Sequence, residues 1–343
     1  MLELDGARGE GGGQVLRTAL ACSAITRQPF RITNLRANRP EPGLRPQHVA
    51  VAQAFASLTG GRVAGAEVGA MTLAFEPGPM AGGELRADIG TAGSIPLFVQ
   101  ALLPALARSG SFWRISVTGG TDGKWAPPFD YLARVHVDTL ERLGWRPRVK
   151  LVRRGWYPRG GGAAVLEAGP WDPKPFALER TGEPFRLQGR VAMSNLPDHV
   201  GARVRTSALE RLAEDGFTKA EIDVTGMPAL DAGVAVTLWA DDGRCRLGAS
   251  ALGERGVPSE QVGRAAADDL LAELRGGGSV DARAADQLMI YAALAAAQGP
   301  CTYTTREATP HARTNAEVLA SFLPVSIAFA PAAGAVRVTA RPR

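Results

Sequence analysis

Cysteine, histidine and lysine are scarce in this 343-residue chain, and their scarcity argues against several classes of protein. The three cysteines, at positions 22, 245 and 301, lie far apart and form no CxxC pair. We therefore expect neither a disulfide framework nor a zinc site, and the composition fits the reducing cytoplasm. The N-terminal residues do not follow the basic and then apolar pattern of a secretion signal, so none is expected.

Apolar runs long enough to cross a bilayer are also missing. Residues 288–297 form an apolar run, whereas a spanning helix needs about 20 such residues. Hydrophobic residues make up 45% of the chain, which is ordinary for a globular protein. We therefore expect no membrane association, a large core and more than one domain.

Lysine occurs only at positions 124, 150, 174 and 219, so arginine carries almost all of the positive charge behind the net charge of +5. Because no lysine follows the first glycine run, a P-loop is excluded. GxSxG and HExxH motifs are absent, and the glycine spacing does not fit the strict dinucleotide-binding pattern. Arginine binds phosphate through a rigid fork, so a polyanionic partner is expected; the alternative is a GC-rich genome that favours arginine codons.

A weak internal repeat organises most of the sequence. Each copy has a glycine-containing or small-residue turn, an apolar helix, a strand, a second helix and a hairpin. The helix pairs are expected at 14–25 and 48–58, at 96–107 and 131–143, and at 286–297 and 315–322. Alternating strands and helices predict a layered α/β fold, and three such small units would share one core.

The interval between the second and third copies is too long by about a hundred residues, enough for a small domain. Residues 185–275 contain their own predicted strands and two amphipathic helices. We therefore predict a three-repeat domain, 1–184 and 276–343, with an inserted α/β domain at 185–275.

The first glycine turn, Asp5-Gly-Ala-Arg-Gly-Glu-Gly-Gly-Gly-Gln14, is the first candidate site. Glycine lets a backbone approach a ligand closely, and the helix that follows offers free N–H groups to an anion. Glu10 would repel phosphate unless a divalent cation lay between them. The alternative is a tight strand-to-helix turn.

A second candidate is the stiff loop at 35–48, which holds Arg36, Arg39 and Arg45 among prolines. Such a frame suits bidentate recognition of phosphate, whereas a solvated basic loop is the alternative. Pro46 predicts a helix start, which places Gln47 and His48 in the first turn.

Three further segments combine small or polar residues with helix starts. Gln100 lies in an apolar helix and needs a partner, either a ligand or the backbone. The loop at 119–130 could form the wall of a base pocket, or be packed internally by Trp125 and Phe129. Asp286 is either the N-cap of the third apolar helix or a site residue that orients a histidine or holds a ribose.

The four histidines divide into two pairs. His136 is expected in a helix, and His199 on the surface of the insert. His48 and His311 lie at or just before the second helix of the first and third copies, so they could face one cleft. A histidine can act as a covalent nucleophile, whereas the alternative for His311 is a surface loop residue.

Taken in order, these segments resemble the RNA 3′-terminal phosphate cyclase family. The resemblance runs from residue 4 to about residue 324. It rests on Asp5-Gly-Ala, Gly9-Glu-Gly-Gly-Gly-Gln14 and Arg17; Arg39-Pro, Pro42-Gly-Leu and Gln47-His48; Gly90 and Ala92-Gly-Ser94; Gly119-Gly-Thr121 and Ala126-Pro127; Tyr157-Pro and Gly160-Gly-Gly162; Ala285-Asp-Gln-Leu288; and His311 with Thr314-Asn315.

The resemblance implies three units of two helices and four strands, similar to the enolpyruvyl transferases, with the insert before the third. It also implies ATP-dependent conversion of an RNA 3′-phosphate to a 2′,3′-cyclic phosphate, the chemistry of a ligase. In this reading His311 is the nucleophile, and Glu10 is the acid beside Mg²⁺ or Mn²⁺. The family's ATP positions match Arg17, Gln100, Pro127, Arg283, Ala284, Ala285, Asp286 and Gln287. Its phosphate-handling positions match Arg36, Arg39, Gln47 and His48.

One position departs from the family, because relatives often carry an aromatic residue where this chain has Arg283. A non-catalytic branch of the same fold acts in ribosome biogenesis and lacks the nucleophilic histidine. The intact His-x-x-Thr-Asn context at His311 favours the enzyme. An enolpyruvyl-type transferase would need a lysine-rich phosphate site, which this chain lacks. The oligomeric state is not indicated by the sequence.

Overall fold

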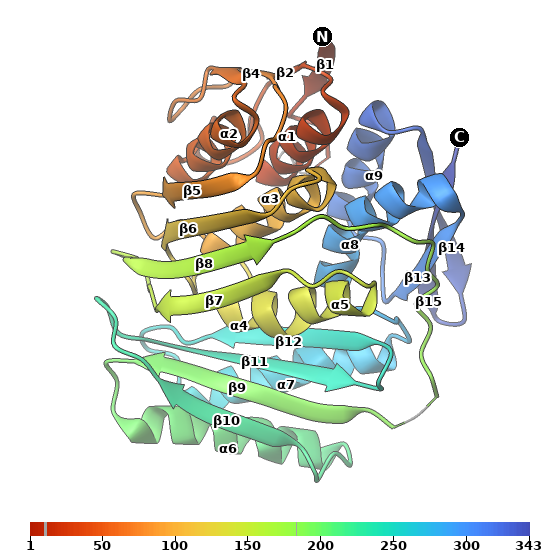
Figure 1. The fold of residues 1–343 in the computed structure, drawn as a ribbon. Coiled ribbons are helices and arrows are strands. Elements are labelled where there is room, and N and C mark those ends of the chain that lie inside the picture. The colour runs from red at the N-terminus through yellow and green to blue at the C-terminus, as the bar shows by residue number, and fades with distance from the viewer. Residues whose placement is uncertain (10–11, 183) are drawn as a thin grey trace.

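The computed structural model describes residues 1–9, 12–182 and 184–343. Figure 1 shows four sheets with helices packed against them. The arrangement confirms the α/β class that the alternating strands and helices predict. In the part of the chain that the structure describes, no helix is long and apolar enough to cross a membrane.

The first unit has a sheet in the order β1-β2-β4-β3, in which β1 and β2 are parallel. Its elements are β1 (Leu2–Asp5), α1 (Gly13–Thr26), β2 (Phe30–Thr33), α2 (Pro46–Thr59), β3 (Arg62–Ala64) and β4 (Leu73–Glu76). Helix α1 follows the glycine turn as predicted. Proline in the first turn of α2 fixes the backbone where that helix begins.

The second unit repeats this pattern in the order β5-β6-β8-β7, again with its first two strands parallel. Its elements are β5 (Gly83–Asp88), α3 (Ile95–Arg108), β6 (Trp113–Gly119), α4 (Phe129–Tyr131), η1 (Leu132–His136), α5 (Val137–Arg142), β7 (Arg148–Arg153) and β8 (Gly162–Ala168). The helix expected at 131–143 begins at Phe129, and η1 is a π-helical turn within it. Ser94 caps α3 by accepting a hydrogen bond from the Leu97 amide at 3.1 Å.

The third unit has three strands in the order β13-β15-β14. Its elements are α8 (Ala282–Ala295), η2 (Ala296–Gln298), β13 (Cys301–Thr305), α9 (Pro310–Phe322), β14 (Val325–Ala332) and β15 (Ala335–Pro342). A parallel bridge between Ala177 and Thr302 takes the place of the missing strand, and the Leu178 amide donates to the Thr302 carbonyl at 2.9 Å. The segment around Ala177 therefore occupies the place of the first strand of this unit. In sequence, the insert lies between that segment and the first helix of the unit, α8.

The insert forms a sheet of its own, in the order β10-β9-β11-β12. Its elements are β9 (Arg186–Ser194), α6 (Asp198–Glu214), β10 (Glu221–Gly226), β11 (Gly233–Asp241), β12 (Arg246–Leu252) and α7 (Ser259–Arg275). Helices α6 and α7 pack on each other and on this sheet, at the base of the molecule in Figure 1.

Two separate apolar cores follow from this arrangement. In the larger one, α1 packs on α2, α3 and α9, and α3 contacts α8, so the three units share one interior. The second core lies within the insert, around residues such as Val191, Val236 and Leu270. Boundaries near residues 185 and 275, as predicted from the sequence, would separate these two cores.

Candidate active site

A cavity of about 1070 Å³ opens between the three units and the insert. Its walls come from the start of α1, the loop at 36–48, the loop at 120–128, strand β12 and the starts of α3, α8 and α9. Segments from both ends of the chain therefore meet in one place.

The first turns of five helices line this cavity. They contribute Gly13 of α1, Gln47 of α2, Leu97 of α3, Arg283 of α8 and His311 of α9. The N-terminus of a helix carries unpaired N–H groups and a partial positive charge. Several such termini around one cavity favour a ligand with several negative charges.

The charged side chains around the cavity point to the same kind of ligand. Among the described lining residues, six are basic and two, Glu254 and Asp286, are acidic. The basic residues are Arg17, Arg36, Arg39, Arg45, Lys124 and Arg283. This excess of positive charge matches a polyphosphate or a nucleic acid end.

His311 lies in the first turn of α9, and the start of this helix is tied to α8. Thr309 is the N-cap: its hydroxyl accepts a hydrogen bond from the Ala312 amide at 3.0 Å and donates to the Asp286 carboxylate at 3.0 Å. The Asn315 side chain donates to the Asp286 carbonyl at 2.9 Å. These bonds fix the backbone that presents His311 to the cavity.

Two glycines at the start of α1 let four side chains approach the backbone closely. A Cβ at Gly12 would lie 3.1 Å from Arg39 Nη2 and 3.5 Å from His311 Cε1. A Cβ at Gly13 would clash with His48 Nε2 and lie 2.9 Å from Arg17 Nη1. The glycine turn thus connects the two histidines and two of the arginines through one short stretch of backbone.

His48 is buried, with 2% of its surface exposed, although it lines the same cavity. Its Nδ1 accepts a hydrogen bond from the Arg45 amide at 3.0 Å, so the neutral ring carries its proton on Nε2. Burial, together with the charges of Arg17, Arg36 and Arg45, lowers the pKa of His48 to about 3. At neutral pH this histidine is an uncharged hydrogen-bonding group.

Arg17 is a half-buried cation that lines the cavity. Its Nη2 donates to Gln14 Oε1 at 2.8 Å, and no carboxylate among the described residues forms an ion pair with it. Burial lowers its pKa to about 10, so the side chain is still charged at neutral pH. A half-buried arginine that lines a cavity and has no ion pair with a described carboxylate is suited to bind phosphate.

The loop at 36–48 is a framework as well as a source of charge. Arg36 donates to the carbonyls of Gly43 at 2.9 Å and Glu41 at 3.1 Å, while Arg45 forms an ion pair with the Glu41 carboxylate. Gln47 Oε1 accepts from the Ser94 amide at 3.2 Å, which joins this loop to α3. Part of the hydrogen-bonding capacity of Arg36 is therefore used to hold the loop.

Gln100 is 5% exposed, yet neither its Oε1 nor its Nε2 has a hydrogen-bond partner among the described residues. Its side chain lines the cavity. Leaving a buried amide unsatisfied costs about 1–3 kcal/mol. A bound ligand would supply the missing partners, which favours the ligand alternative over a backbone bond.

Comparisons with known proteins agree with this geometry. The sequence model described as "RNA 3'-terminal phosphate cyclase" matches residues 8–329. The chain belongs to the RNA 3′-terminal phosphate cyclase family. A protein of that name from Pyrococcus furiosus is 42% identical over 94% of this chain and 93% of its own. Another, from Nitrosospira multiformis, is 42% identical over 100% of this chain and 97% of its own. A third, from Pyrobaculum neutrophilum, is 44% identical over 94% and 93%.

Two of the positions suggested by the cyclase family resemblance lie away from the cavity surface. Ala284 and Ala285 are buried in α8 and do not line the cavity. The suggestion that Asp286 caps this helix is wrong, because Asp281 is the N-cap and accepts from the Ala284 amide at 2.9 Å. The helix accordingly begins at Ala282 rather than at residue 286.

The remaining positions predicted for a cyclase, Glu10 apart, line the cavity: Arg17, Arg36, Arg39, Gln47, His48, Gln100, Pro127, Arg283, Asp286, Gln287 and His311. Arg283 lies 5.2 Å from the ring centroid of Tyr131, and its Nη1 donates to the Ser250 hydroxyl at 3.0 Å. Its guanidinium therefore lies over an aromatic ring, which itself is buried.

The sequence interpretation missed the contribution of the insert to this cyclase family site. Residues 250–252 of β12 and Glu254 form part of the wall, and Glu254 pairs with Lys124 at 2.6 Å. These are small, apolar or single acidic residues in a predicted hairpin, and nothing in their pattern indicates a site. Only the packing of the insert on the second unit brings them to the cavity.

The metal predicted from the cyclase family is not matched by the described side chains. Outside residues 10, 11 and 183, no group of three His, Cys, Asp or Glu side chains could hold a metal ion. The two acidic lining residues are engaged, since Asp286 accepts from Thr309 and Glu254 pairs with Lys124. Glu10, the predicted metal-binding acid, lies outside the described residues.

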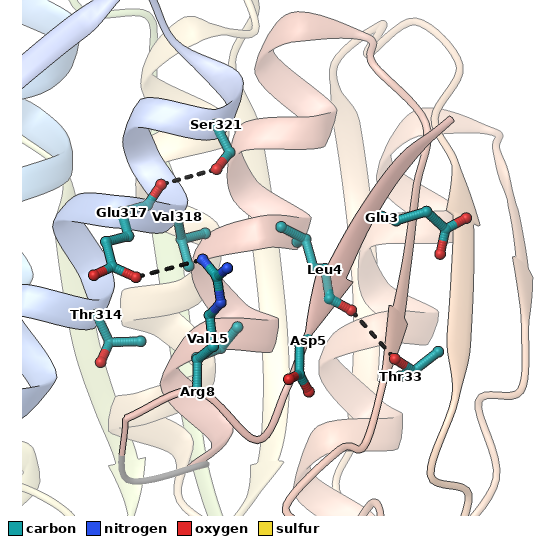
Figure 2. Close-up of a pocket in the computed structure, with 10 residues that line it drawn as sticks. All are labelled: Glu3, Leu4, Asp5, Arg8, Val15, Thr33, Thr314, Glu317, Val318 and Ser321. Atoms are coloured by element: carbon teal, nitrogen blue, oxygen red, sulfur yellow. Dashed lines mark hydrogen bonds and ion pairs between the residues drawn. The ribbon is translucent and has the colours of Figure 1, made fainter.

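A second cavity, of about 310 Å³, lies between β1, α1 and α9 (Figure 2). Among the described residues that line it, three carry carboxylates, namely Glu3, Asp5 and Glu317, and one, Arg8, is basic. Arg8 approaches Glu317 at 3.6 Å. This charge balance is the opposite of that in the large cavity and does not favour phosphate.

Proposed function

We propose that this protein uses ATP to convert the 3′-terminal phosphate of an RNA to a 2′,3′-cyclic phosphate. The observation that carries the proposal is the meeting of His311, from the end of the chain, with the arginines of residues 17–45 at one cavity. A nucleophile beside several phosphate-binding groups is what nucleotidyl transfer requires. The names of the relatives, which cover nearly the whole chain, support the same activity.

The proposed reaction has three steps. An imidazole nitrogen of His311 attacks the α-phosphorus of ATP, a P–N bond forms, and the bond to the pyrophosphate oxygen breaks. An oxygen of the RNA 3′-phosphate then attacks the phosphorus of the histidine-bound AMP, which frees the histidine. Finally the neighbouring 2′-hydroxyl attacks the RNA phosphorus and loses its proton, so that the ring closes and AMP leaves.

The cavity residues would share the charge that develops in these steps. Arg17, Arg36, Arg39 and Gln47, with the neutral His48, would bind phosphate oxygens near the start of α1. Gln100, Pro127, Arg283 and Gln287 would hold ATP, and Asp286 would keep the start of α9 in position through Thr309. Ala284 and Ala285 would act only through the packing of α8.

A divalent ion, Mg²⁺ or Mn²⁺, stays part of the proposal as a companion of ATP. Mg²⁺ commonly keeps several waters and binds through substrate phosphates plus one or two carboxylates, so it needs no protein cage. Glu10 is the proposed carboxylate. We also propose a cytoplasmic location, in keeping with the three free, buried cysteines.

The test is self-labelling of the full-length protein with α-labelled ATP and a divalent metal. We expect acid-labile AMP on the wild-type protein and none on His311→Ala. His199→Ala is the matched control, because His199 is also the second residue of its helix but lies exposed in the insert. Labelling that survives His311→Ala, or a wild-type protein that neither takes label nor cyclises a phosphorylated RNA, would refute the proposal. The latter result would favour the non-catalytic alternative.

A further inference from the structure

Trp125 differs from every other tryptophan in the chain. The chain has six tryptophans, and the other five are at most 7% exposed, whereas Trp125 is 97% exposed. The sequence left open whether Trp125 and Phe129 pack this loop internally. Phe129 is buried, as that alternative expects, but the alternative is wrong for Trp125 because its ring is exposed. An exposed ring of this size calls for an explanation.

The loop that carries Trp125 is firmly held at both ends. The guanidinium of Arg154, which is 3% exposed, binds both carboxylate oxygens of Asp122, at 2.9 and 2.8 Å, and also pairs with Asp130. Buried ion pairs of this kind, in which one guanidinium joins two carboxylates, restrict the backbone more than surface pairs do. The segment between the two aspartates is thus a short arch with fixed ends.

The middle of the arch also contacts the insert. Lys124 pairs with Glu254 of the insert at 2.6 Å, next to Trp125. Trp125 itself has a φ of 66°, a left-handed conformation that bulky residues rarely adopt. A strained backbone that displays an aromatic ring, rather than burying it, is typical of a functional position.

Trp125 also lines the large cavity, beside the arginine-rich walls described above. A nucleic acid end bound there would enter past this ring. We propose that Trp125 stacks on a nucleobase of the single-stranded RNA, upstream of its terminal phosphate. The inference rests on the proposed function and names how the polynucleotide part of the substrate is held.

The exposure of the ring favours RNA over the base of ATP. A base stacked on a fully exposed ring keeps its hydrogen-bonding edge in water, so every sequence is accepted equally. That suits a substrate defined by its phosphorylated end. A single fixed nucleotide is better selected by enclosed polar groups, such as the unpartnered amide of Gln100.

The experiment compares full-length wild-type protein with Trp125→Ala, Trp125→Phe and Phe112→Ala. Phe112 is the matched control, because it is also an exposed aromatic residue but does not line the cavity. The probe is a short single-stranded RNA with a 3′-phosphate. We measure its dissociation constant, its KM in cyclisation, and the self-labelling of each protein with ATP alone.

We expect Trp125→Ala to weaken RNA binding and to raise the KM for RNA by about tenfold, while self-labelling is unchanged. Trp125→Phe should retain most of the affinity, because it keeps a ring, and Phe112→Ala should behave as the wild type. Binding should also protect the tryptophan fluorescence from iodide in the wild type, since only Trp125 is accessible to the quencher.

Unchanged RNA affinity in Trp125→Ala would overturn the inference, as would an equal loss in Phe112→Ala. A loss of self-labelling in Trp125→Ala without RNA would assign the ring to ATP instead. These failures differ from a failure of the proposed function, in which the wild-type protein neither takes label nor cyclises RNA.

Discussion

His48 and His311 occupy similar places in two repeats, and the structure gives them opposite surroundings. Each lies in the first turn of the second helix of its unit, and both line one cavity. His48 is buried, with Nδ1 bonded to the Arg45 amide and arginines around it. His311 is partly exposed, on a helix start that Thr309 and Asp286 hold in place.

The comparison shows that the repeat sets where a side chain lies but not what it can do. A ring with an engaged nitrogen and a depressed pKa is suited to donate one hydrogen bond. A partly exposed ring on a fixed helix start can reach a phosphorus atom. The fold thus supplies two equivalent positions, and we propose that the neighbouring residues assign binding to His48 and chemistry to His311.

The strongest test of this division makes the same substitution at both positions. We expect His311→Asn to reduce RNA cyclisation by at least about 10³-fold, because the covalent step is lost. His48→Asn should retain activity within about tenfold, because the amide oxygen can still accept from the Arg45 amide. Cyclisation rates of the two purified variants measure the difference. Equal losses, or an active His311→Asn, would end the distinction between the two histidines.

A substitution at Arg17, whose charge acts on His48, gives a second test of the comparison. In Arg17→Met we expect the KM for ATP or for RNA to rise by roughly 10- to 100-fold, as a charged hydrogen bond to phosphate is lost. Thermal stability should not fall, because the substitution removes no ion pair with a described carboxylate and the environment of Arg17 already disfavours its charged form. The exposed Arg62→Met is the control. An unchanged KM together with a lower Tm would instead make Arg17 a structural residue.

The pH dependence of stability tests whether His48 is neutral. Its pKa is about 3 in the folded protein and about 6.5 when unfolded, so only the unfolded chain takes up its proton as pH falls below 6.5. Stability from His48 is therefore present above pH 6.5 and is lost on acidification, by about 2 kcal/mol at pH 5. Urea unfolding at pH 5 and at neutral pH should show a smaller acid loss in His48→Asn. His136, whose pKa burial lowers to about 4, should behave similarly. An acid loss in His48→Asn as large as in the wild type would refute the neutral state.

The smallest effect is expected from a substitution at Thr309, which tests how firmly His311 must be held. Thr309→Ala removes the N-cap of α9 and the bond to Asp286, which should destabilise the protein by about 1 kcal/mol. Because the start of α9 is loosened, we expect kcat to fall more than KM changes. Thr309→Ser should restore both values. A normal kcat in the alanine variant would show that His311 needs no such support.

Much of the fold could be predicted because local sequence patterns within each unit indicate where its helices lie. Apolar periodicity and helix-start residues indicated α1, α2 and α3 within a few residues. The start of α8 could not be chosen in this way, since Asp281 and Asp286 both precede apolar residues. Asp281 is the cap, and it also accepts from the Tyr131 hydroxyl of the second unit and the Gly248 amide of the insert, bonds that depend on how these parts pack together.

The candidate site was accessible to sequence reasoning where chemistry-bearing residues cluster, as in the arginine loop and around His311. The protonation state of His48 and the exposure of Trp125 could not be predicted from the sequence. The neutral state of His48 depends on arginines brought close by folding, and the display of Trp125 depends on Arg154, which lies beyond the loop it holds. Sequence patterns describe neighbours along the chain, whereas these properties depend on neighbours in space.

The bridge between Ala177 and Thr302 has a consequence for biosynthesis. The first strand position of the third unit leaves the ribosome before the insert, whereas β13 and α9 follow long after it. We expect the first two units and the insert to fold while the remainder is still being made, and the third unit to close last. The arginines at positions 17–45 would therefore be in place well before His311 arrives, so a chain cut short after α7 would hold this proposed phosphate-binding part of the site without the proposed nucleophile.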